Sequence, residues 1–274
     1  MKISLFYVDA FTSEVFKGNP AAVCLLESWL PDEVLQSIAA EHNLSETAFI
    51  VKEAKEVFQL KWFTPTMEVD LCGHATLAAA HVLFSIYNFL HKTVQFRTKS
   101  GILPVKQCED GKITLDFPVF EINPYQSTPL LKEGLGISFS EVYKSRDLLV
   151  ILNSEKEVLK LKPDFGKLLM LDCLGVIATA PGTNCDYVLR FFAPKAGINE
   201  DPVTGSAHST LAPYWSKKLK KNILFSQQFS ERSGEIWCQQ KGDRVLISGN
   251  AITYMQGNIS ISIKPHSNLV PFDY

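Results

Sequence analysis

The feature that most constrains this chain is a long apolar stretch that follows Gly73. Alanine, leucine, valine, isoleucine and phenylalanine fill most of positions 75–90, with a few polar residues such as His81 among them. The stretch predicts a helix over residues 73–90 that is apolar on nearly every side. Such a helix has no face suited to water, so other structure must cover it all round. It is also shorter than the roughly 20 apolar residues that span a bilayer, so we expect it at the centre of a soluble fold.

The rest of the chain predicts mostly short strands, which could supply that cover. Apolar and β-branched runs are separated by Gly, Pro, Asn and Asp, and they predict strands at 3–8, 21–26, 46–51, 58–63, 93–97, 113–117, 148–152, 175–179, 187–192, 235–239, 244–248 and 257–263. Further helices are expected at 32–41, 165–171 and 206–219. The expected fold class is therefore α+β, with strands wrapped around a central helix.

The two halves of the chain contain similar segments in the same order. In each half a strand ends in Phe-x-Pro, an acidic loop follows, and a Gly-x-Ala tripeptide opens a helix. The copies cover residues 63–75 and 192–207, and their glycines, Gly73 and Gly205, are 132 positions apart. Such a repeat predicts two pseudo-symmetric lobes, each a barrel-like, mostly antiparallel sheet wrapped around a central helix.

This duplication divides the chain into three expected segments. Residues 1–118 form the N-terminal lobe, with its central helix from Gly73. Residues 119–257 form the C-terminal lobe, with its central helix from Ser206. Residues 258–274 are expected to form a strand that returns to the N-terminal lobe.

Charge and the N-terminal pattern exclude several function classes. The chain has 27 Lys and Arg against 29 Asp and Glu, a formal net charge of −2, so it lacks the basic excess that nucleic-acid binding usually needs. Residues 1–9 alternate like a strand, and Asp9 would interrupt the apolar core of a signal peptide. We expect a cytoplasmic protein with neither a nucleic-acid nor a membrane partner.

The six cysteines are scattered and form no C-x-x-C pair. A zinc cluster needs ligands at short regular spacing, and a disulfide framework is not expected in a chain of this length with an intracellular start. We expect no metal and interpret the cysteines as small buried apolar residues. Cys72 stands apart because it directly precedes the glycine that opens the first central helix.

The two predicted helix starts offer a site for an anion. If the lobes meet across a cleft and both helices point their N-termini into it, the free N–H groups at Gly73 and Gly205 favour a carboxylate. Glycine there lets the backbone approach a ligand closely. The alternative is that each Gly-x-Ala only permits close helix packing, and the spacing leaves both interpretations open.

Several ionisable residues near these helix starts are acid/base candidates. A histidine in the first turn of a helix is disfavoured as a cation, so we expect a neutral His74. Asp201 precedes a proline, which favours an extended backbone; it could orient a substrate amine or hydroxyl, or only occupy the acidic position common before a helix. The remaining candidates are Asp70, Glu200 and His208, of which His208 fits a structural role better.

Glu46 begins an otherwise apolar strand, and its side chain could face either water or a pocket. The pattern alone favours a solvated strand end for this glutamate.

Four long motifs stand in a fixed order: Gly18-Asn19-Pro20-Ala21-Ala22-Val23, Ser45-Glu46-Thr47-Ala48-Phe49, EVDLCGHAT at 68–76 and EDPVTGSAH at 200–208. Together they resemble the phenazine-biosynthesis PhzF-like family, and most closely its animal and bacterial phenazine-biosynthesis-like-domain members. The resemblance extends along essentially the whole chain, dense over 1–80 and 187–235 and thin over 120–185.

The resemblance implies a diaminopimelate-epimerase-like fold, usually paired as a homodimer, with the active site between the lobes and no cofactor. It places the family's catalytic glutamate at Glu46, against the preference of the strand pattern. It implies that a small anionic substrate is bound by Gly73, His74, Asp201, Gly205 and Ser206, and that no metal takes part. One departure is Ser233, where the family has a glycine; it puts the loop geometry in doubt if a positive φ is needed, and the loop at 228–234 is left out of the expected site.

The resemblance also bears on mechanism. Racemases and epimerases of this fold use two cysteine thiols, one at each helix start, and Cys72 occupies the first position while Thr204 occupies the second. A hydroxyl is too weak a base for that role. We therefore expect an isomerase that shifts a proton within a small carboxylate-bearing, cyclic or amino-acid-like metabolite through one carboxyl group, Glu46, whose pKa burial would raise towards neutrality.

Two alternatives remain open beside this isomerase. One is an amino-acid racemase or epimerase, and the other is a small-molecule-binding relative that has lost turnover.

Overall fold

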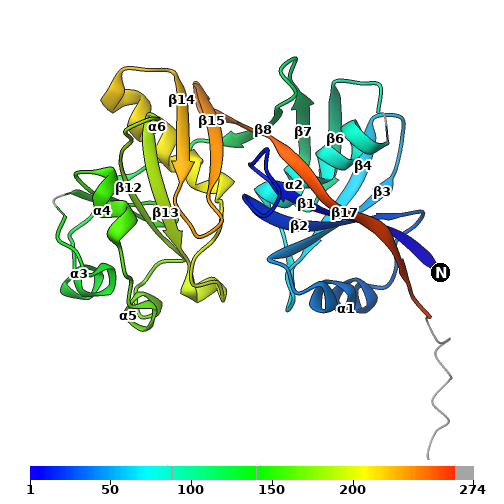
Figure 1. The fold of residues 1–274 in the computed structure, drawn as a ribbon, viewed down its shortest axis with the longest axis horizontal. Coiled ribbons are helices and arrows are strands. Elements are labelled where there is room, and N and C mark those ends of the chain that lie inside the picture. The colour runs from blue at the N-terminus through cyan, green and yellow to red at the C-terminus, as the bar shows by residue number, and fades with distance from the viewer. Residues whose placement is uncertain (88, 140, 263–274) are drawn as a thin grey trace, which may run out of the picture.

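The computed structural model describes residues 1–87, 89–139 and 141–262. Two lobes lie side by side, the N-terminal one around α2 (Gly73–His81) and the C-terminal one around α6 (His208–Leu219) (Figure 1). Both lobes consist mainly of sheet with few helices, so the predicted α+β class is confirmed. No helix in the described ranges is long and apolar enough to cross a membrane.

The strands of the two lobes repeat one pairing pattern. In the N-terminal lobe the strands pair in the order β1 (Lys2–Ala10), β2 (Asn19–Leu26), β3 (Glu46–Lys52), β4 (Val57–Phe63), β6 (Thr93–Thr98), β7 (Gly101–Gln107) and β8 (Ile113–Pro118). The successive pairs are antiparallel, parallel, antiparallel, parallel, antiparallel and antiparallel. The short β5 (Glu68–Val69) pairs with β4.

The C-terminal lobe has the same sequence of pairs. Its order is β10 (Glu141–Lys144), β11 (Leu148–Ile151), β12 (Val176–Pro181), β13 (Tyr187–Phe192), β14 (Ile223–Gln228), β15 (Gly234–Lys241) and β16 (Arg244–Gly249), with the same alternation of directions. This correspondence confirms the pseudo-symmetry that the repeated motif predicts.

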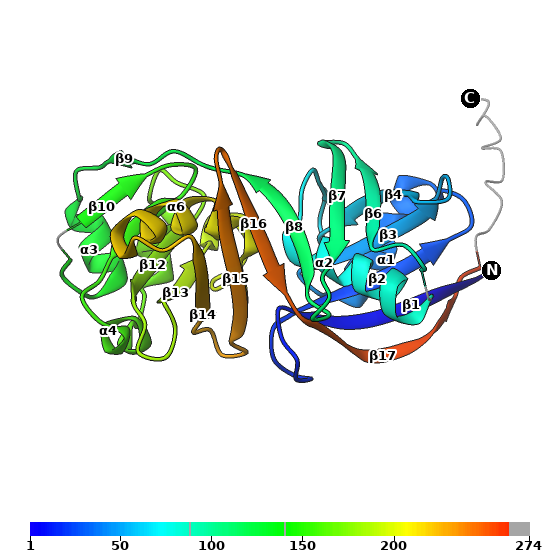
Figure 2. The same ribbon diagram turned by 90° about the horizontal axis from the view of Figure 1, so that it is seen from above.

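Exchanged strands join the lobes. After β8 the chain crosses to the C-terminal lobe, where β9 (Asn123–Pro124) pairs with β10, and after β16 it crosses back, where β17 (Ala251–Ser260) pairs with β1 along its length (Figure 2). β8 and β16 also pair with each other at the joint. The two sheets are therefore one continuous hydrogen-bonded system, which fixes one lobe against the other.

The apolar helix α2 lies inside the N-terminal sheet, as its composition requires. Every residue from His74 to Ala80 is buried, and the helix packs against β1, β2, β3, β8 and β17. The prediction that this helix reaches residue 90 is wrong. It widens into a π-helical turn over Val82–Ile86 and ends there, and Leu90 is 93% exposed; apolar composition alone does not extend a helix beyond the sheet that covers it.

The second central helix also differs from the prediction at its start. A 3-10 turn over Gly205–Ala207 precedes α6, so the α-helix begins at His208 rather than at Ser206. Pro213 lies inside α6 and cannot donate a backbone hydrogen bond to Ser209. The Ser209 carbonyl instead accepts the backbone N–H of Phe120 at 3.0 Å, which ties the helix to the segment that connects the lobes.

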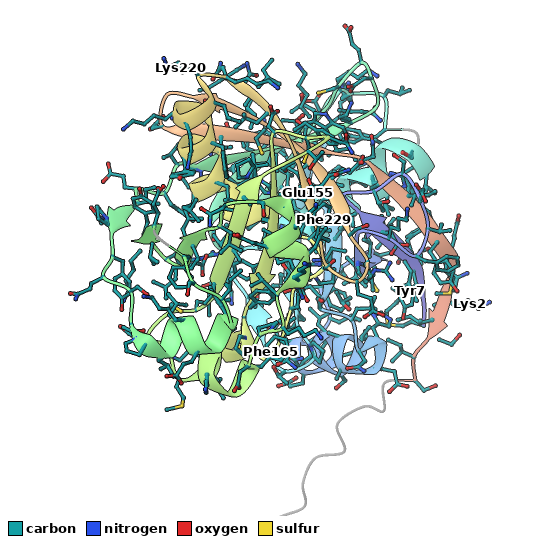
Figure 3. The ribbon with its side chains drawn as sticks, turned by 60° about the vertical axis from the view of Figure 1, so that its left-hand side comes forward. Lys2, Tyr7, Glu155, Phe165, Lys220 and Phe229 are labelled. Carbon is teal, nitrogen blue, oxygen red and sulfur yellow. The ribbon has the colours of Figure 1, made fainter. Side chains whose placement is uncertain are left out.

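The remaining helices cover the outer faces of the sheets. α1 (Asp32–His42) covers β3 and β4, while α3 (Pro129–Leu135), α4 (Glu155–Lys160) and α5 (Phe165–Leu169) cover a separate apolar cluster of the C-terminal lobe. Phe165 and Phe229, labelled in Figure 3, pack against that cluster.

Other differences from the predicted elements have local causes. β7 contains Pro104, which argues against a central strand, and β14 has no strong alternation; neither was predicted. The strand expected at 257–263 begins earlier, at Ala251, and ends at Ser260. Residues 263–274 lie outside the described residues, and the segment boundaries 1–118, 119–257 and 258–274 remain a prediction.

The turn between β1 and β2 depends on Gly18. Its φ is +67°, and a Cβ there would overlap the Ala10 carbonyl oxygen. Gly197 also has a positive φ, +83°, but has open space around it. We expect Gly197→Ala to lower the free energy of unfolding by about 1–2 kcal/mol and Gly18→Ala to lower it by a further ~1–3 kcal/mol from the overlap. Urea titrations of both variants test this, and equal losses would contradict it.

Candidate active site

A cavity of about 180 Å³ lies between the two lobes. Its walls include six residues from both lobes that the sequence singles out: Glu46, Gly73, His74, Asp201, Gly205 and Ser206. Positions more than 150 residues apart in the chain therefore share one chamber. Their individual roles remain predictions.

The start of α2 and the 3-10 turn that precedes α6 face each other across this cavity. A Cβ at Gly73 would lie 3.9 Å from the Cα of Gly205 and 3.5 Å from the Phe117 ring, which are ordinary contact distances. Packing alone would therefore accept an alanine at position 73. At Gly205 a Cβ would lie 3.2 Å from the Phe11 ring, so tight packing contributes to the choice of glycine there.

Glu46 turns into the cavity and meets His74. The carboxylate Oε2 lies 3.1 Å from the imidazole Nε2, and the two side chains are only 14% and 8% exposed. Both atoms are buried and have no hydrogen-bond partner within the described part of the chain. The two groups therefore form a close ion pair that is not aligned as a hydrogen bond.

This pair reverses two expectations about charge. Burial raises the pKa of the Glu46 carboxyl, but the positive charge of His74 outweighs this effect, so the pKa lies below the ordinary 4.5. The expected rise towards neutrality is wrong. Burial likewise lowers the pKa of His74, but its neighbours Cys72 and Glu46 raise it well above the ordinary 6.5. The expectation of a neutral His74 is wrong as well, because it considered only the helix start.

Cys72 completes the group on the N-terminal side. Its Sγ lies 3.6 Å from His74 Nδ1, and burial and the charge of Glu46 raise the pKa of the thiol. Cys72, His74 and Glu46 each offer a ligand atom within 4.8 Å of the other two. Inspection of linear spacing does not find this cluster, because it joins the start of β3 to the start of α2.

Asp201 stands on the C-terminal side in a framework of hydrogen bonds. Asn19 Nδ2 donates to Oδ1 at 2.8 Å, and the Thr204 hydroxyl donates to Oδ2 at 2.5 Å. Burial raises the pKa of Asp201, and the negative charge of Glu46 adds to the rise, although His74, Thr204 and Asn19 oppose it. The two cavity carboxyl groups thus have pKa values displaced in opposite directions.

Sequence reasoning missed two residues that hold this framework. Asn19 belongs to a quoted motif but had no assigned role. Gln228 accepts the backbone N–H of Thr204 at 2.8 Å and donates to the Asp201 carbonyl at 2.7 Å, yet it belongs to the loop that was left out. Ser233 adopts φ +55°, so the serine takes the backbone conformation that glycine would favour, and the loop is retained.

Arg146 is a third missed residue. Its Nη2 donates to the Ser206 hydroxyl at 3.2 Å, and its guanidinium is held by the buried Asp147 at 2.9 and 3.1 Å. The side chain is 40% exposed and lines the cavity. It lies in the stretch 120–185, where the resemblance is thin, so no motif pointed to it.

Three further sequence candidates lie outside the cavity walls. Asp70 is exposed, and Glu200 is occupied by Arg190, with contacts at 2.7 and 2.8 Å. His208 is completely buried, its Nδ1 lies 2.7 Å from the Tyr187 hydroxyl, and burial lowers its pKa to about 3. A neutral, structural histidine fits these observations.

Comparison with known proteins identifies the family of this chain and agrees with its fold. A family model for the phenazine biosynthesis-like protein matches residues 8–257. The chain belongs to this family. A Pseudomonas aeruginosa protein named as an uncharacterized isomerase is 50% identical over 96% of this chain and 100% of its own length. The family match and this name identify the chain as an isomerase.

Solved structures extend the comparison to the fold. A PhzF-family protein of Enterococcus faecalis is 48% identical, with a TM-score of 0.93 over 95% of this chain and 100% of that one. A hydroxyproline epimerase from Agrobacterium vitis is 10% identical, with a TM-score of 0.58 over 94% of this chain and 92% of that one. At that identity the likeness shows the fold alone.

The ion pair predicts distinct protonation states for buried histidines. At pH 7 we expect a protonated His74 but neutral His81 and His208, whose pKa values burial lowers to about 4 and about 3. In Glu46→Gln the pKa of His74 should fall, because burial is then opposed by Cys72 alone. Ring ¹⁵N shifts over a pH series measure this, with His74→Gln assigning the signal and Glu56→Gln, beside the surface His91, as control. A His74 signal unchanged by Glu46→Gln would contradict it.

Proposed function

We propose that this protein is a cofactor-independent isomerase of a small carboxylate-bearing metabolite, in which Glu46 removes a proton from one carbon and returns it to another. The observation that carries the proposal is a buried carboxylate beside a cationic histidine, inside a cavity shared by both lobes. One C–H bond breaks and another forms on the same molecule, so the reaction needs no oxidant or reductant. The homodimer and the cytoplasmic location implied earlier also remain proposals.

The Glu46–His74 pair suits a base that strengthens during the reaction. In the free protein the histidine charge keeps Glu46 ionised, which prepares it to accept a proton. As negative charge develops on the substrate, His74 can direct its proton towards that charge. Glu46 then loses part of its counter-charge, and burial raises its pKa. Proton removal and charge stabilisation are thereby coupled through one contact.

Asp201 serves as a fixed polar partner in this proposal. Asn19 and Thr204 donate hydrogen bonds to its two carboxylate oxygens, and Gln228 donates one to its backbone carbonyl. Two carboxyl groups whose pKa values are displaced in opposite directions commonly divide acid and base work. Here Glu46 has the lowered pKa of the base, while Asp201, with the raised pKa, would orient a substrate amine or hydroxyl.

The helix starts and Arg146 would bind the substrate carboxylate. The N–H groups at Gly73 and Gly205 lie on opposite walls, and a helix N-terminus favours an anion. Arg146 brings a full positive charge to the Ser206 hydroxyl. A small anion between these groups would lie with its neighbouring carbon towards Glu46.

Hydrogen exchange with solvent tests Glu46 as the base. Wild-type protein incubated in D2O with a panel of cyclic and amino-acid-like carboxylates should label one or more of them, measured by NMR. Glu46→Gln should slow labelling by at least about 100-fold, since a positioned base contributes that much or more. Glu68→Gln, on β5 of the same lobe and outside the cavity walls, is the control and should label normally. Equal labelling by wild type and Glu46→Gln would remove Glu46 as the base.

The same assay separates the isomerase from an amino-acid racemase. A two-base racemase would depend on Cys72, and Cys72→Ala would abolish exchange. If the protein is the proposed isomerase, Cys72→Ala should retain most of the exchange. The contact of Thr204 with Asp201 disfavours the racemase, since the second basic position is occupied by a hydroxyl that donates its proton. A tightly bound carboxylate with no exchange at all would favour the non-catalytic alternative.

Arg146 should determine affinity rather than chemical rate. We expect Arg146→Gln to raise the KM of a labelled carboxylate about tenfold and to change kcat less, since charge-assisted hydrogen bonds contribute roughly 1.5–3 kcal/mol and this side chain is partly exposed. Exchange rates over a concentration series measure both constants. Lys144→Gln removes a nearby cation that pairs with Asp172 on the surface and should leave both unchanged. A fall confined to kcat would contradict carboxylate binding by Arg146.

A further inference from the structure

We propose that Glu46, Cys72 and His74 form a binding site for one thiophilic divalent cation, of which Zn²⁺ is the typical case. Each residue offers one ligand atom, and the three atoms lie within 4.8 Å of one another. They provide a carboxylate oxygen, a thiol sulfur and an imidazole nitrogen, which are the ligand types that zinc takes from proteins. The cation would stand where the proposed substrate reacts, so the site would be inhibitory.

The separations of the ligand atoms suit a tetrahedral ion. Zinc bonds of about 2.3 Å to sulfur and about 2.0–2.1 Å to nitrogen or oxygen place neighbouring ligand atoms ~3.3–3.6 Å apart. The 3.1 Å between Glu46 Oε2 and His74 Nε2 is close to this range, whereas the 3.6 Å contact of Cys72 Sγ is with the other ring nitrogen, Nδ1. Only one ring nitrogen can bind the ion, so the three ligand atoms, which lie within 4.8 Å of one another, must move closer together by side-chain rotation when it binds.

Unsatisfied buried atoms point to a ligand at this position. Glu46 Oε2 and His74 Nε2 face each other without a hydrogen bond and have no other partner among the described residues. Buried polar atoms in a folded protein normally have a hydrogen-bond partner, so two that lack one call for an explanation. A cation between them would satisfy both atoms.

Charge balance also favours the ion. On binding, the Cys72 thiol and the protonated His74 would each release a proton to solvent. The resulting thiolate and the Glu46 carboxylate carry two negative charges that neutralise a divalent cation, and the neutral imidazole completes the set. Asp201 on the facing lobe adds negative charge nearby, although Asn19 and Thr204 already occupy its oxygens. The cavity of about 180 Å³ leaves a fourth position open, as in zinc sites with three protein ligands.

Cobalt(II) spectroscopy tests the site without knowledge of the substrate. Full-length reduced protein is titrated with Co²⁺, and one equivalent should produce visible d–d bands and a near-ultraviolet thiolate-to-cobalt absorption, both removed by Zn²⁺. Cys72→Ser should lose the thiolate absorption. Glu46→Gln and His74→Gln should weaken cobalt binding by roughly 100-fold, at least as much as the loss of an outer-shell partner. Thermal unfolding checks that each variant is folded.

Cys108→Ala is the matched control, since this partly buried cysteine lies away from the cavity and contacts Thr114. It should bind cobalt like the wild type. No thiolate absorption in the wild type, or one that survives Cys72→Ser or disappears in Cys108→Ala, would overturn the metal site.

Only the inhibitory consequence rests on the proposed function, and the two can fail separately. Cobalt binding with the expected variant pattern supports the site even if no carboxylate exchanges deuterium. Exchange that proceeds normally while one equivalent of Zn²⁺ is bound would overturn the inhibitory role.

Discussion

The burial of α2 is the constraint on which the rest of the structure depends. A helix without a polar face can be stable in water only when its sides are covered, and the N-terminal sheet curls around it to do so. The sheet covers the sides of the helix but not its two ends. The far end terminates in a π-helical turn, and the near end opens at Gly73 towards the other lobe. The ionisable groups of the cavity gather at this near end.

The exchanged strands turn this enclosure into a defined site. Because β9 and β17 each cross to the other lobe while β8 pairs with β16, the starts of α2 and α6 meet at a fixed separation. Ionisable groups there are removed from water, so burial acts strongly on each pKa, and the charges of the neighbouring groups decide the net direction for Glu46 and His74. The charge of His74 lowers the pKa of Glu46, while burial raises the pKa of Asp201 and the charge of Glu46 adds to that rise.

The sequence could predict the enclosed helix, most strands, the duplication and the six residues that share the cavity, because these follow from periodicity and from long motifs. It could not predict Arg146 or Gln228, since their contacts depend on how loops from separate strands meet in three dimensions. The sequence analysis also predicted a neutral His74, whereas the structure favours a protonated one. A rule for the helix start was applied to a residue whose protonation is decided by Glu46, 28 positions earlier in the chain.

The duplicated lobes are alike in strand order but not in chemistry. The start of α2 brings together a carboxylate, a cationic histidine and a thiol. The corresponding region before α6 offers Thr204 and Asp201, which are hydrogen-bonded to each other and to Gln228. A racemase needs proton-transfer groups on both faces of its substrate, which requires both helix starts to be reactive. Here the α2 side holds three ionisable groups, and the other side is a framework of hydrogen bonds. Such an asymmetry suits a reaction in which one residue moves a proton along one face while the opposite lobe holds the molecule still.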